Sequence, residues 1–215
     1  RAFAEDMAYL RFVGIKPVVV HGGGPQITAK RAGLGIESGF REGLRYTDEK
    51  TIEVVRDVLR NQIGAQLASL IRDSGAVAKV LSGEDDDLFR AVKVKGKGPD
   101  GEVDLGLDGE VRSVNPRSVV QAIERGDVPV ISTVAPTTQG ELLNVNADLA
   151  AASLAVALGA EKLMVLTDVA GLYADWPNRD SLVSEITANE LRELMPALES
   201  GMIPKMQACL DAVDG

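Results

Sequence analysis

Apolar positions along this chain follow two different periods. Short runs rich in β-branched residues predict buried strands, and segments with an apolar residue at every third or fourth position predict amphipathic helices. Strands that alternate with helices are typical of an α/β fold with a mostly parallel sheet and helices on both faces. The sequence predicts strands at 17–20, 77–81, 128–132, 141–143 and 162–166.

The expected helices begin and end at recognisable residues. Pro25 suits the first position of a helix, because its missing N–H costs nothing there. Thr47 is the expected N-cap of a long helix, which carries an apolar stripe from Ile52 to Ile71 and ends at Gly75. Further helices are expected over residues 1–13, between Pro116 and Gly126, between Asn146 and Gly159, after the capping box of Thr187 and Glu190, and from Pro204.

Residues 83–114 interrupt the alternation of strands and helices. The segment 91–95 alternates between apolar and charged residues, and 96–101 is a turn rich in Gly, Pro and Asp. Together with the short apolar segments at 103–105 and 111–114, this pattern predicts an antiparallel excursion from the main sheet.

Composition narrows the class of protein. Of the 215 residues 45% are hydrophobic but only 4% are aromatic, so the core must be aliphatic. The formal charge of −9 argues against nucleic acid or an anionic membrane as a partner. The apolar segment Leu149–Ala160 is too short to span a bilayer, and no signal peptide is visible, so we expect a soluble, cytoplasmic protein. The single cysteine excludes an internal disulfide, and the single histidine excludes a Cys/His metal cluster.

The most informative local feature is the glycine run in Val18-Val19-Val20-His21-Gly22-Gly23-Gly24-Pro25. Without Cβ atoms, three glycines let backbone N–H groups turn toward an anion and let a ligand approach closely. The start of the following helix adds a partial positive charge. A tight strand-to-helix turn explains the same residues equally well, so other anion-handling groups must decide between the two readings.

Three other segments carry residues that suit an anion site. Asn144–Asp148 places two amides and a carboxylate at a helix start, where ordinary capping by Asn146 accounts for one of them. Lys205 falls in the first turn of the last helix, where it suits a phosphate or is a solvated surface lysine. Arg45 precedes the long helix and suits a carboxylate, or is a free surface arginine.

Other residues favour ordinary structural roles. His21 has no acidic neighbour in the sequence, Cys209 lies on an apolar helix face, and the acidic run 84–87 is more typical of a solvated loop than of a metal site. The chain has neither a GxxxxGK[ST] motif nor a complete GxGxxG motif.

Five motifs taken in order, VVVHGGGP, GLRYT, NVNAD, LTDVAGLY and GMIPK, resemble the amino acid kinase family over essentially the whole chain. GLR and NVNAD resemble the branch that acts on N-acetyl-L-glutamate rather than those that act on carbamate, uridylate or aspartate. The resemblance implies a three-layer α/β sandwich that transfers the γ-phosphoryl group of ATP to the side-chain carboxylate of N-acetyl-L-glutamate, in arginine biosynthesis. Mg²⁺ would arrive with the nucleotide, and no protein metal site is implied.

The resemblance also implies roles for individual residues. Gly23 and Gly24 would hold the substrate through backbone N–H groups near the transferring phosphoryl group. Arg45 would clamp the α-carboxylate of the substrate, and Asn144 would bind the acetylamino acid.

The catalytic and nucleotide-binding roles are implied in the same way. Lys205 would stabilise charge on the transferring phosphoryl group, and Asp148 would orient the catalytic lysines. The ATP site would be lined by Asp168, Val169, Ala170, Gly171, Leu172 and Tyr173.

Two lobes follow from the resemblance. Residues 1–160 would bind the acetylamino acid and form the dimer interface, and residues 161–215 would belong to an incomplete nucleotide-binding lobe. Family members begin with a strand that carries a Lys-x-Gly-Gly loop and end with further strands, none of which is found in this sequence. We therefore expect the sheet to lack its first and last strands and this chain alone to be inactive. Members of the family form homodimers or hexamers built as trimers of dimers.

Two alternatives stay open at this point. One is a kinase of the same family that acts on an aminoadipate derivative. The other is a non-catalytic, amino-acid-sensing domain with the same fold.

Overall fold

A three-stranded parallel sheet lies at the centre of the computed structural model, which describes residues 1–36, 40–41, 44–98 and 101–215. Its strands are, in spatial order, β1 (Val19–His21), β7 (Val128–Ser132) and β4 (Ala78–Ser82). Every residue of the middle strand is buried, as expected when helices cover both faces of a parallel sheet.

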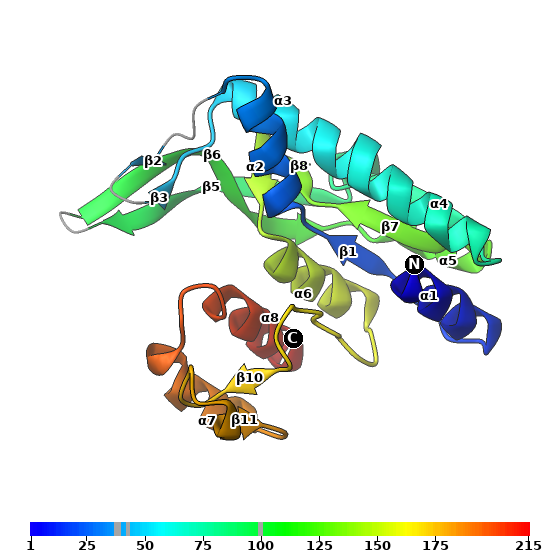
Figure 1. Ribbon diagram of the computed structural model, residues 1–215. Coiled ribbons are helices and arrows are strands. Elements are labelled where there is room, and N and C mark those ends of the chain that lie inside the picture. Colours follow the sequence, from blue (N-terminus) through cyan, green and yellow to red (C-terminus); the bar gives the residue numbers. More distant parts are fainter. Residues whose placement is uncertain (37–39, 42–43, 99–100) are drawn as a thin grey trace.

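Helices lie on both faces of this sheet (Figure 1). On one face, α1 (Ala2–Phe12) and α4 (Ala65–Asp73) share a buried cluster with Val130. On the other face, α6 (Ala147–Leu158) shares a cluster with Ile131, since neighbouring side chains in a strand point to opposite faces. The α/β class with a mostly parallel central sheet is therefore confirmed.

The antiparallel excursion is a long hairpin of β5 (Phe89–Gly98) and β6 (Gly101–Val114). β6 also pairs in parallel with β9 (Leu142–Val145). β9 in turn pairs antiparallel with β8 (Val134–Pro136). The expected excursion is confirmed, but it belongs to a second, four-stranded sheet. Asn144 consequently lies inside a strand, whereas the sequence pattern placed it after one.

The long helix has three parts: α3 (Glu49–Asp57), the π-helical segment η1 (Val58–Gly64) and α4. Its apolar stripe is buried or partly buried in the core, as expected, but the expected cap is wrong. Asp48 is the N-cap, since its Oδ1 accepts the Thr51 N–H at 2.7 Å. The backbone of Thr47 instead forms hydrogen bonds with Leu105 and Leu107 of β6, so this residue lies along the edge of β6 and not at the helix start.

Substitution of Asp48 tests this cap. Hydrogen bonding from Thr51 lowers the pKa of the Asp48 carboxyl. A lowered pKa in the folded state stabilises the protein at neutral pH, and this contribution is lost as the pH falls through that pKa. Asp48→Ala should lower the free energy of unfolding by about 1 kcal/mol at neutral pH, measured by urea denaturation. Asp48→Asn keeps a capping oxygen and should lose much less; equal losses would contradict the assignment.

The remaining elements surround these two sheets. They are α2 (Gly24–Gly33), β2 (Phe40–Arg41), β3 (Leu44–Arg45), η2 (Asp85–Asp87), α5 (Arg117–Glu124), β10 (Leu172–Tyr173), η3 (Arg179–Ser181), β11 (Leu182–Val183), α7 (Ala188–Leu194), η4 (Met195–Ala197) and α8 (Ile203–Asp214). The helix starting at Pro25, the Thr187–Glu190 capping box and the helix starting near Pro204 are confirmed.

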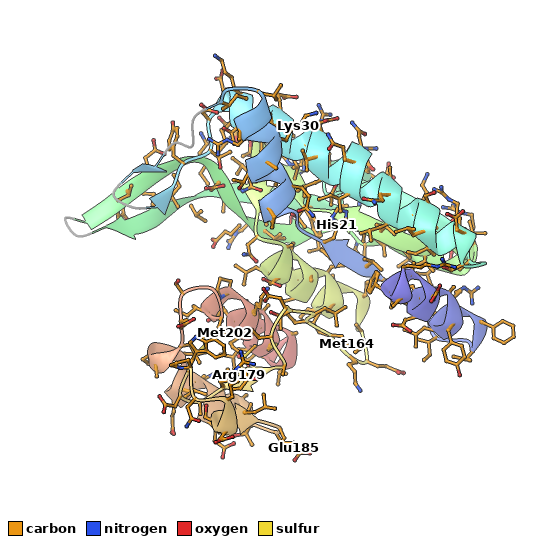
Figure 2. All side chains as sticks on the ribbon, viewed as in Figure 1. His21, Lys30, Met164, Arg179, Glu185 and Met202 are labelled. Carbon is orange, nitrogen blue, oxygen red and sulfur yellow. The ribbon has the colours of Figure 1, made fainter. Side chains whose placement is uncertain are left out.

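The strand expected at 162–166 is wrong. These residues follow α6 as an irregular segment, and Met164 and Leu166 are 70% and 65% exposed; Figure 2 shows Met164 on this segment. An apolar run becomes a strand only when another strand accepts and donates its backbone hydrogen bonds. No strand of the part of the chain that the structure describes pairs with it.

Candidate active site

The glycine run forms the turn between β1 and α2. Gly23 is the N-cap of α2, and Pro25 lies in the first turn of this helix, as the sequence predicts. An added Cβ at Gly22 would lie 3.4 Å from the Cβ of Ala147, so the turn touches the start of α6. A Cβ at Gly24 would meet nothing within 4 Å. The turn is therefore packed at Gly22 and open at Gly24.

The π-helical segment η1 supports the turn from behind. A Cβ at Gly23 would overlap Ile63 Cδ1 and lie 2.9 Å from Leu59 Cδ2. Both contacts are too short for a Cβ atom, so any larger residue at this position would make the side-chain ends of Ile63 and Leu59 shift. Such π-helical segments are frequent at functional sites, and here the segment packs against the glycine turn.

Lys205 and Asp148 form an ion pair beside the glycine turn. The Nζ atom of Lys205 lies 3.1 Å from Oδ2 and 3.3 Å from Oδ1 of Asp148, and each side chain is 24% exposed. Asn146 caps α6 as expected, since its Oδ1 accepts the N–H groups of Asp148 and Leu149 at 2.9 and 3.1 Å. The pair joins the first turn of α8 to the first turn of α6, and both charges remain accessible to a ligand.

The starts of three helices thus lie side by side. Gly22 contacts the first residue of α6, and Lys205 of α8 pairs with the second. Each helix start carries a partial positive charge from its unpaired N–H groups. With the lysine, these groups favour an anion. We call Gly22–Gly24, Asp148 and Lys205 the glycine-loop site.

A second polar cluster lies at the junction of β6 and β9. Asn144 Nδ2 and Thr47 Oγ1 both donate to Asp108 Oδ1, each at 2.9 Å. Asp108 and Asn144 face each other across the parallel strand pair. The sequence analysis missed Asp108, because no local motif marks it within the alternating residues of β6.

Two groups of predicted site residues are not joined to the glycine-loop site by the described contacts. Arg45 lies in β3, and its side chain is outside the described part of the structure. In the segment 168–173, Asp168 accepts a hydrogen bond from Thr167 at 3.2 Å, and β10 pairs with β11. The ring of Tyr173 packs edge-on against Trp176, with centroids 5.2 Å apart. Their nucleotide and substrate roles stay predictions.

Comparison with known proteins decides the family. The family model described as "Amino acid kinase family" matches residues 1–215. This chain belongs to the amino acid kinase family.

Several proteins similar to this chain are named acetylglutamate kinase. The protein of Leifsonia xyli subsp. xyli is 60% identical in an alignment of 218 positions, which covers all of this chain and 72% of that protein. The protein of Arthrobacter sp. is 59% identical, over all of this chain and 71% of that protein. These relatives confirm the prediction of a kinase and of the acetylglutamate branch of the family.

Solved structures agree with the amino acid kinase fold. The smu.665 protein of Streptococcus mutans superposes with a TM-score of 0.83 at 26% identity, over 98% of this chain and 83% of that chain. Carbamate kinase from Giardia superposes with a TM-score of 0.70 at 17% identity, over 98% of this chain and 79% of that chain. At 17% identity this second likeness concerns the fold alone.

His21 lies between the glycine turn and η1. Figure 2 shows it at the end of β1. Its Nδ1–H donates to the Gly22 carbonyl at 3.2 Å, and a Cβ at Gly64 would lie 3.3 Å from its Nε2. Burial lowers the pKa of the imidazole, more than the Gly22 contact raises it. The lowered pKa favours the neutral ring, which lies between the glycine turn and Gly64 of η1; its structural role stays a prediction.

Three of the four carboxylates in the acidic run 84–87 form ion pairs. Three arginines bond to it: Arg56 to Glu84 at 2.8 Å, Arg60 to Asp85 at 2.8 Å and Arg90 to Asp87 at 2.6 Å. The run is therefore a surface turn with three ion pairs, in which Asp86 and Asp87 are exposed. Over residues 1–36, 40–41, 44–98 and 101–215, no three His, Cys, Asp or Glu side chains gather as metal ligands.

Among the helices of the described ranges, none combines the length and the apolar character that crossing a membrane requires.

Proposed function

We propose that this protein transfers the γ-phosphoryl group of ATP to the side-chain carboxylate of N-acetyl-L-glutamate. The observation that carries the proposal is the Lys205–Asp148 pair beside the glycine turn, in a chain 54–60% identical to several proteins named acetylglutamate kinase. The reaction is a step of arginine biosynthesis.

The glycine-loop site suits the electrostatic needs of this reaction. A substrate carboxylate is ionised at neutral pH and needs no general base. Phosphoryl transfer mainly requires positioning of the reactants and stabilisation of charge on the phosphoryl oxygens. Lys205 supplies a positive charge, and Asp148 holds its ammonium group in place. The N–H groups of Gly23 and Gly24 would bind the substrate near the transferring group.

The acetylamino acid would lie between the glycine turn and the second polar cluster. In this proposal Asn144 binds the acetylamino group, and Arg45 binds the α-carboxylate through paired hydrogen bonds. Residues 1–160 would form this substrate lobe and the dimer interface of a homodimer or of a hexamer.

The nucleotide would bind to the lobe of residues 161–215, along the segment 168–173. Mg²⁺ bound to the phosphates of ATP would add positive charge beside the transferring group.

A hydroxamate assay tests the proposed function. The complete natural protein should form acyl phosphate, trapped as hydroxamate, only with both ATP and N-acetyl-L-glutamate present. Turnover of an aminoadipate derivative in preference to N-acetyl-L-glutamate would contradict the substrate. Calorimetric binding of an amino acid without production of ADP would instead contradict the reaction and indicate a sensor domain.

A further inference from the structure

Asp108 joins two segments that carry proposed substrate-binding residues. On β9, Asn144 donates its Nδ2–H to Asp108 Oδ1 at 2.9 Å. On the segment before α3, Thr47 donates its Oγ1–H to the same oxygen at 2.9 Å, and Thr47 is 1% exposed. No step of the proposed reaction uses this carboxylate. Its place next to Asn144 nevertheless gives it a definite effect on that amide.

The carboxylate determines which way the Asn144 amide points. A carboxylate accepts hydrogen bonds and does not donate them. Rotating the amide by half a turn would set its carbonyl oxygen against Asp108 Oδ1 and lose the hydrogen bond. The amide therefore presents its NH₂ group to Asp108 and its carbonyl oxygen away from it. That carbonyl oxygen is an acceptor and is suited to an N–H donor of a ligand.

We infer that Asp108 is a positioning residue that makes Asn144 select substrates carrying an N–H on the α-carbon. The inference rests on the proposed function, because it assumes that Asn144 faces the acetylamino group. N-acetylated and other N-acylated amino acids carry this N–H, whereas their ester analogues carry an oxygen instead. A site built to accept a hydrogen bond rejects an analogue that cannot donate one.

Thr47 provides a matched control. Its backbone is fixed independently, because its N–H donates to Leu105 O at 3.0 Å and its carbonyl accepts from Leu107 N at 2.7 Å. Thr47→Val removes one hydrogen bond from Asp108 but leaves the bond between Asp108 and Asn144. If Asp108 only stabilises the fold, substitution of Asp108 and Thr47→Val should both change the substrate preference. If Asp108 acts through Asn144, only substitution of Asp108 should change it.

The test compares N-acetyl-L-glutamate with its ester analogue 2-acetoxyglutarate in the complete natural protein. The amide introduced by Asp108→Asn can donate as well as accept, so the Asn144 amide can rotate by half a turn and still keep a hydrogen bond. We expect the KM for N-acetyl-L-glutamate to rise about tenfold, and the preference for amide over ester to fall by about the same factor. The kcat and the KM for ATP should change less than about twofold. Thr47→Val should keep the amide preference of the unmodified protein.

The outcomes separate this inference from the proposed function. If the unmodified protein phosphorylates neither compound, the proposed function fails. If it prefers the amide and Asp108→Asn has the same preference, the role of Asp108 is overturned. An equal loss of preference in Thr47→Val overturns it too, because the effect is then structural. Asp108→Ser, whose hydroxyl also donates and accepts, should repeat the result of Asp108→Asn and serves if that variant does not fold.

Discussion

Replacing Lys205 with methionine is expected to lower kcat by about a thousandfold while leaving the fold intact. The side chain keeps its length and apolar stem but loses the positive charge that would stabilise the phosphoryl oxygens, and such charges contribute factors of this size. Asp148 is left without its cation at the start of α6, but a carboxylate is favoured there by the helix dipole. The measurement is steady-state turnover of ATP and N-acetyl-L-glutamate, with thermal unfolding of both proteins.

Lys162→Met is the matched control, because Lys162 is an exposed lysine of the same lobe. It should retain the full kcat. If Lys205→Met retains kcat within a factor of about ten, the glycine-loop site is not the place of phosphoryl transfer. If it unfolds, the pair with Asp148 is structural, and the proposed catalytic role loses its support.

Features set by neighbours in the sequence could be predicted. The glycine turn, the Pro25 helix and the Asn146 cap each depend on a few consecutive residues, and the structure has all three. Local signals work here because turns and caps are closed by hydrogen bonds within one helical turn. For the same reason Lys205 was recognisable as unusual, since a lysine in a first helical turn meets an unfavourable dipole.

Features that depend on distant residues could not be predicted from pattern. Thr47 suits an N-cap by residue type, but hydrogen bonds to β6, nearly 60 residues away, determine its place. Asp108 becomes significant only through the pairing of β6 with β9. The run 162–166 has the composition of a strand, yet composition does not supply the neighbour that a strand needs. Lys205 and Asp148 are 57 positions apart in the sequence. Their association was predicted from the family resemblance alone.

The glycine turn gives a second large effect, in which stability and activity change in opposite directions. Gly24→Ala adds a methyl group that meets no protein atom within 4 Å, at the first residue of α2. Alanine favours a helix over glycine by up to about 1 kcal/mol, so the free energy of unfolding should stay constant or rise. The same methyl group would occupy the space proposed for the substrate. We expect kcat/KM for N-acetyl-L-glutamate to fall about a hundredfold, measured beside urea denaturation.

Two further glycines show whether this loss comes from the site. Gly33→Ala, at the other end of the same helix, also adds a methyl group to open space, and should keep full activity. Gly23→Ala would collide with Ile63 and Leu59 of η1, and overpacking of this kind lowers stability by about 1–3 kcal/mol. Its activity should fall together with its stability, because either the side-chain ends of Ile63 and Leu59 or the turn itself must shift to make room for the methyl group. Only a ligand on the open side of the turn makes Gly24→Ala inactive without loss of stability, so full activity of this variant would place the substrate elsewhere.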